Sequence, residues 1–189
     1  MPKISPDLTA AIRRMSPDRK DKLLLRLIAK DKLLIAQLQF ELLEDKSTVE
    51  ERVENLKDII IKELKNVETY YFTPGNLMMA MRSLNARITE HVKITKDKLS
   101  EVTLTIFLLV ESFKLYYTRL QRFPVERSDT LADYVLRRTA FVIKKAEKLH
   151  EDYYIEFSDD LQTVLDFIYN YKPTIIRVKE AGIPRRWQD

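Results

Sequence analysis

Glycine and cysteine are the residues that this chain lacks: 189 residues include two glycines, Gly75 and Gly182, and no cysteine. Hairpin turns and phosphate-binding loops need residues that tolerate positive φ, and glycine supplies this most readily. Neither glycine lies in a glycine-rich run, which excludes dinucleotide-binding, P-loop and nucleophile-elbow motifs. We therefore expect a chain built almost entirely of helices joined by short turns.

The absence of cysteine excludes disulfides, thiolate nucleophiles and cysteine-ligated zinc, and it suits a reducing cytosol. The first residues contain no apolar segment typical of a secretory signal. The longest nearly uncharged stretch, Val102–Val110, has nine residues, whereas a spanning helix needs roughly twenty. We expect a cytoplasmic protein with no membrane span.

Charge is abundant but nearly balanced, with 33 basic and 29 acidic residues and a net charge of +4. The two signs are mostly interleaved, as on solvated helix faces. Two regions lean basic: residues 74–98 carry five basic and two acidic residues, and residues 174–189 carry four and two. These regions are candidate surfaces for an anionic partner.

Helix start signals divide the chain. Ser5-Pro6-Asp7 and Ser16-Pro17-Asp18 each combine a capping serine, a first-turn proline and an acid that favours the helix dipole. Together with apolar spacings of three and four, they predict five long and two short helices. The predicted helices are a short one from Ser5, then 16–44, 47–70, 76–94, 97–122 and 128–157, and a last one from Ser158 to about Lys172.

The predicted fold class is all-α, either an antiparallel helical bundle or a short α-α superhelix, because short connections make consecutive helices antiparallel neighbours. We expect one helical domain over 1–173 and a basic, non-helical C-terminal tail over 174–189. The apolar stripes predict a buried core. Its members are Leu27, Ile28, Leu38, Ile60, Leu84, Ile106, Phe107, Val110, Leu136 and Phe167.

Metal and cofactor motifs are incomplete. The only histidines are His91 and His150, and a di-iron bundle needs two Glu-x-x-His pairs. Glu147-x-x-His150 occurs once, and we interpret it as an exposed cluster. The run Glu50-Glu51-Arg52-Val53-Glu54 is half of a helical magnesium-binding motif, and no Glu-x-x-Asp follows in the next predicted helix. We interpret it as acids that suit a helix N-terminus, and we expect neither metal nor cofactor.

The predicted basic helix over 76–98 carries the main candidate binding residues, Arg82, Asn85, Arg87 and His91. Arginine, asparagine and histidine on helix faces suit phosphate, carboxylate or a nucleic-acid backbone. The alternative is that the arginines pair with neighbouring acids. The sequence alone does not decide between these two interpretations.

Glu111 lies within an apolar helix segment, where a carboxylate is costly unless it is paired or exposed. We expect a structural pair, with Arg82 or Arg138 as partner, or surface exposure. A general base with a raised pKa is the alternative, and it would centre a small all-α enzyme on Arg82, His91 and Glu111.

The tail ends with Arg185, Arg186 and the single tryptophan, Trp187. An aromatic ring flanked by arginines suits docking to a partner or an anionic surface. It equally suits a ring that tucks into the domain and holds the tail down.

The sequence favours a non-enzymatic, cytosolic helical protein that acts through protein–protein interaction, with another protein or a second copy as partner, and it identifies no catalytic residue. Two alternatives remain. One is a nucleic-acid or anion-binding protein that uses the helix over 76–98 and the tail; the other is the small enzyme centred on Arg82, His91 and Glu111.

Overall fold

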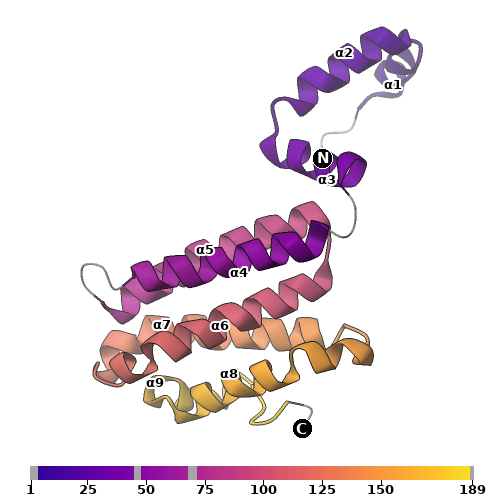
Figure 1. Cartoon of the computed structure of the whole chain (residues 1–189). Helices are drawn as coiled ribbons and strands as arrows, with labels where there is room; N and C mark the ends of the chain where they lie inside the picture. Colours follow the sequence, from indigo (N-terminus) through magenta and orange to yellow (C-terminus); the bar gives the residue numbers. More distant parts are fainter. Residues whose placement is uncertain (1–3, 45–47, 68–71, 188–189) are drawn as a thin grey trace. The chain divides into compact units, whose positions relative to one another are not determined.

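A computed structural model describes residues 4–44, 48–67 and 72–187 and shows an all-α protein (Figure 1). It is 80% helical, with ten helices and no strand in these described ranges, which confirms the predicted fold class. The chain divides into two compact units, Met1–Asp45 and Lys46–Asp189. The predicted division into 1–173 and 174–189 stays a prediction.

The first unit contains α1 (Pro6–Arg13), α2 (Pro17–Ile28) and α3 (Lys32–Leu43). Ser5 caps α1 as predicted, its Oγ accepting a bond of 3.3 Å from the Leu8 backbone N–H. The single helix predicted over 16–44 is wrong. Asp31 Oδ1 accepts bonds from the backbone N–H groups of Leu33 and Leu34, and this cap starts a separate helix.

The second unit contains most of the helical residues: α4 (Thr48–Asn66), α5 (Pro74–Thr95), α6 (Lys98–Leu120), α7 (Val125–Ala146), the 3₁₀ helix η1 (Glu151–Glu156), α8 (Ser158–Asn170) and α9 (Lys172–Ile175). Thr73 caps α5, with Pro74 in its first turn. Lys96, at φ 58°, closes α5, and Asp97 immediately caps α6. Two expected helix ends, Ser47 and Tyr70, lie outside the described residues.

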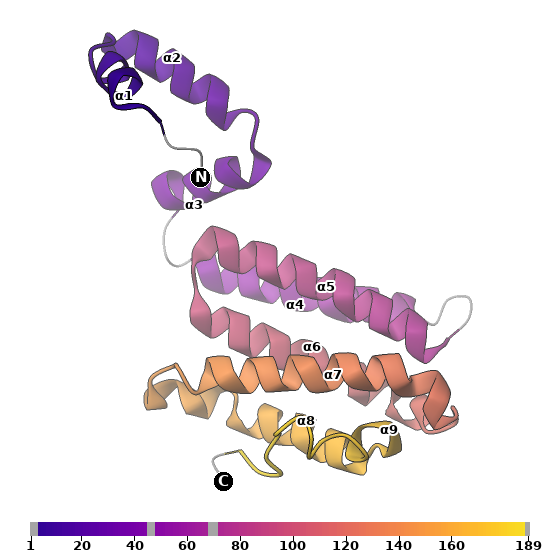
Figure 2. The ribbon, with the colours of Figure 1, turned by 180° about the vertical axis from the view of Figure 1, so that it is seen from behind.

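Helix α6 is central in the second unit and contacts α4, α5, α7 and α8 (Figures 1 and 2). Twelve of its residues are buried, because an apolar helix enclosed by neighbours buries nearly its whole circumference. Hydroxyl groups reinforce this packing: Tyr116 Oη donates to the Leu64 carbonyl at 2.5 Å and Tyr134 Oη to the Met81 carbonyl at 3.3 Å. These bonds join α6 to α4 and α7 to α5.

The predicted core is confirmed only in the second unit. Ile60, Leu84, Ile106, Val110 and Leu136 are buried there. Phe107 and Phe167 are half-buried, as are Ile28 and Leu38 of the first unit. Leu27 is 52% exposed, so its assignment to the core is wrong.

The C-terminal segment packs against the rest of the second unit. Its first residues are helical, contrary to the prediction, because α9 includes Thr174 and Ile175. The Thr174 hydroxyl bonds to the carbonyls of Ile168 and Tyr171, and Val178 and Ile183 are buried. In the part of the chain that the structure describes, no helix is long and apolar enough to cross a membrane.

Candidate functional site

Helix α5 separates the predicted binding residues onto different sides. Arg82 and Arg87 are exposed. Asn85 is half-buried, and its Oδ1 atom is buried without a hydrogen-bond partner in the described structure. His91 is only 7% exposed and lies 3.0 Å from Ser100 Oγ, measured from its Nε2 atom. The structure therefore groups Arg82 and Arg87 as surface cations and places His91 in the interior.

Burial controls the protonation of His91. Desolvation lowers its pKa below the ordinary value of 6.5. The negative charge of Asp97 opposes this shift, and the positive charge of Arg52 adds to it. A neutral imidazole bonded to a serine hydroxyl is a satisfied core group rather than an exposed anion ligand.

Glu111 does not join Arg82 or His91. It pairs with Lys114 at 3.1 Å, one turn along α6, and its side chain is 20% exposed. The expected partners Arg82 and Arg138 are therefore wrong; Arg138 lies over the Phe141 ring, 4.4 Å from its centroid. Ser100, the neighbour of His91, precedes Glu111 by eleven residues of α6, about 16 Å along the axis. The three residues of the enzyme alternative are not brought together.

The tail residues lie along α8. Trp187 packs edge-on against Tyr154 and Phe157, with ring centroids 5.5 and 6.1 Å apart. Gln162 of α8 binds the backbone of the tail at two points: its Oε1 accepts from the Trp187 N–H at 3.1 Å, and its Nε2 donates to the Arg185 carbonyl at 3.3 Å. Arg185 and Arg186 remain exposed. Of the two alternatives for Trp187, the structure shows the internal one.

Large apolar side chains are exposed on the helices of the first unit. None of the described residues 4–44 is buried. Large aliphatic side chains are among the exposed ones: Ile4, Leu8, Ile12, Leu24, Leu25, Leu27, Leu42 and Leu43. We call these eight the leucine-rich surface. The most exposed are Leu42 and Leu43, at 71% and 81%.

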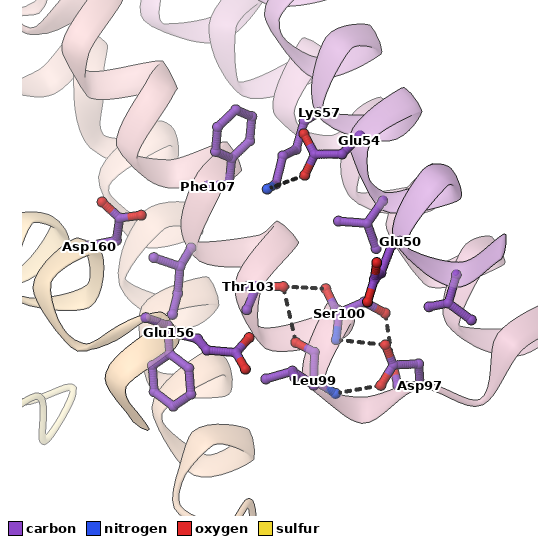
Figure 3. A pocket seen from close by; sticks show the side chains of 14 residues that line it. Glu50, Glu54, Lys57, Asp97, Leu99, Ser100, Thr103, Phe107, Glu156 and Asp160 are labelled. Carbon is purple, nitrogen blue, oxygen red and sulfur yellow. Dashed lines mark hydrogen bonds and ion pairs between the residues drawn. The ribbon is translucent and has the colours of Figure 1, made fainter. Parts of the chain in front are cut away.

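A groove is present within the second unit, between α4, the first part of α6 and the η1–α8 junction (Figure 3). Its hollow has a volume of about 450 Å³. The apolar part of its lining is Val49, Val53, Leu99, Ile106, Phe107 and Phe157. Phe157 also belongs to the buried core, and Phe107 is half-buried and packs against it. We call this feature the acidic groove.

Carboxylates surround the acidic groove. Glu50 and Glu54 lie on its α4 side, and Glu156 and Asp160 lie on the η1–α8 side (Figure 3). Asp97 completes the set, and its carboxylate caps α6 through the backbone N–H groups of Leu99 and Ser100. Among the residues that the structure describes, no three histidine, aspartate or glutamate side chains lie close enough together to hold a metal ion.

Sequence reasoning found only one part of this groove. The run that begins with Glu50 and Glu51 is visible in the sequence, where it indicates acids at a helix start. Asp97, Glu156 and Asp160 gave no signal, because each stands on a different predicted helix. The sequence shows acids near three helix ends, but only the packing of those ends shows that the acids line one hollow.

Comparisons of the chain with protein families, with curated proteins and with solved structures find no match.

Proposed function

We propose that this chain is a non-enzymatic, cytosolic protein that acts through protein–protein interaction, and that the leucine-rich surface binds the partner. One observation carries the proposal: residues 4–44 form three helices without burying a single residue. The absence of cysteine supports the cytosolic compartment. The partner is another protein or a second copy of the chain.

Two physical arguments support a partner for this surface. Isolated helices shorter than about 12–15 residues are marginal in water, and α1, α2 and α3 have 8, 12 and 12 residues. Burying one exposed leucine side chain contributes about 1.5–3 kcal/mol. Helices of this length with this much exposed leucine gain most of their stability by packing against another surface.

Site-specific photo-crosslinking tests the proposal. A photoreactive residue in place of Leu25, which is 65% exposed, is expected to give a protein adduct in cells. The adduct should disappear when Leu24→Ser and Leu27→Ser are added, because these neighbours supply the apolar contact. Sedimentation of the purified chain then shows whether the partner is a second copy of the chain or another protein. An adduct that persists in the serine variant, or none at all, contradicts the proposal.

The exposure of Arg82 and Arg87 favours nucleic-acid binding as a second candidate. Such binding depends on contacts with phosphates and weakens steeply with salt. A purified sample with excess absorbance at 260 nm that high salt removes supports this candidate. The same photoreactive residue placed at Arg87 would then give an adduct with nucleic acid rather than with protein.

A further inference from the structure

We infer that the acidic groove is a second docking site, and that it binds a short amphipathic segment of a partner protein, with an apolar anchor flanked by lysine or arginine. The inference rests on the proposed protein-interaction function and adds the chemistry of one partner. It concerns side chains of the second unit only. Its failure therefore leaves the leucine-rich surface unaffected.

Charge is the first argument. The chain as a whole carries +4, yet the groove is lined by five carboxylates and one ammonium group, that of Lys57. Lys57 is already paired with Glu54 at 2.7 Å. Exposed Glu50, Glu156 and Asp160 have no ion pair among the described residues. A hollow lined mainly by one sign of charge concentrates its potential and attracts the opposite charge, so it favours cations and repels phosphate backbones and anionic lipids.

The apolar lining is the second argument. Val53, Leu99 and Phe107 are half-buried and remain open to the groove. A metal ion or a polyamine gains nothing from such a lining, whereas a leucine or phenylalanine anchor gains free energy by leaving water. The carboxylates stand on opposite sides of the hollow instead of converging on one point (Figure 3). An occupant with an apolar centre and cations on both sides matches this arrangement.

The shape of the site favours a protein segment. The lining comes from two long helices, α4 and α6, and from the junction before α8. Amphipathic helices bind such grooves by placing apolar anchors at spacings of three and four residues. Lysine and arginine next to the anchors then face Glu50 on one side and Glu156 and Asp160 on the other.

The sole tryptophan provides a built-in reporter. Phe157 lines the groove, and its ring is 6.1 Å from the ring of Trp187. An anchor bound beside Phe157 alters the packing of the aromatic cluster that holds the indole ring. Binding is therefore expected to change the fluorescence of the full-length protein without any added label.

The experiment titrates the full-length protein with a designed helical peptide that has leucines on one face and lysines beside them. The groove variant combines Glu50→Gln, Glu156→Gln and Asp160→Asn. The matched control combines Glu63→Gln, Glu90→Gln and Glu147→Gln, three exposed acids that do not line the groove. Both variants change the net charge by the same amount, so they separate local from general attraction.

Three weakened ion pairs are expected to reduce the affinity roughly tenfold in the groove variant, with the control close to the parent. Val53→Ser is expected to weaken binding severalfold without changing its salt dependence. A peptide with serine in place of leucine should bind weakly to all proteins. Equal affinity of the parent, groove and control proteins overturns the inference, and so does an equal loss of affinity in both variants. Tight binding of the leucine-free peptide or of spermine to the groove overturns it as well.

Discussion

At the scale of single residues, His91 shows how burial changes the chemistry of a side chain. Its imidazole is enclosed between α5 and α6 and bonded to Ser100. Removal from water lowers its pKa, as described above. The folded protein therefore binds a proton at His91 less readily than the unfolded chain does, and this difference links stability to pH.

The sign of the linkage gives a prediction for His91→Gln. As pH falls below about 6.5, His91 of the unfolded chain gains a proton first, so the parent protein loses stability. Glutamine does not titrate. The variant should therefore lose less stability than the parent between about pH 7.5 and about pH 5.5, measured by urea unfolding. His150→Gln, which removes the other histidine at an exposed position, is the control. Identical losses in the parent and His91→Gln would contradict the prediction.

At the scale of elements, local signals located most helix starts. Serine followed by proline marks α1 and α2, and both helices begin with that proline. Helix α5 begins at Pro74, two residues before the predicted start at 76. The same reasoning missed the start of α3, because neither proline nor glycine marks the boundary at Asp31. A single carboxylate that accepts two backbone hydrogen bonds is enough to start a new helix, and the spacing of apolar residues does not reveal such a cap.

The C-terminal segment is the element whose behaviour is easiest to test. Deleting residues 183–189 removes buried Ile183 and the contact of Trp187 with Phe157. The free energy of unfolding should fall by about 2–4 kcal/mol, measured by urea unfolding. The full-length protein should show blue-shifted tryptophan fluorescence, because the indole ring is packed among aromatic rings.

A conservative variant distinguishes the stability lost with the ring contacts from the stability lost by shortening the chain. Trp187→Phe retains an aromatic ring beside Tyr154 and should cost less than the deletion. An unchanged unfolding midpoint in the deletion variant, together with red-shifted emission from the full-length protein, would show that the tail contributes nothing to stability.

At the scale of the whole molecule, the two units differ in how they are stabilised. Every buried residue in the described ranges belongs to the second unit, from Leu56 onward. The first unit has helices without a core. Within the second unit, α6 contacts four other helices. The first unit consists of three short helices, none of whose described residues is buried.

A fragment of residues 46–189 is therefore expected to fold alone. Its thermal unfolding, followed by circular dichroism, should be cooperative, with a midpoint within a few degrees of the main transition of the full chain. A fragment of residues 1–45 should show little helix by itself. A non-cooperative transition in the larger fragment would show that its core depends on the first unit.

The sequence by itself determined the helical class, most helix starts and the absence of glycine-dependent motifs. These properties depend on backbone preferences and capping within a few neighbouring residues. Only the tertiary structure decided which apolar residues are buried: Leu27 and Leu84 both lie in apolar stripes, yet the first is exposed and the second enclosed. It also decided that Glu50, Asp97 and Glu156 line one groove. Burial and shared surfaces depend on which helix ends pack together, and that choice is made by contacts between residues far apart in the chain.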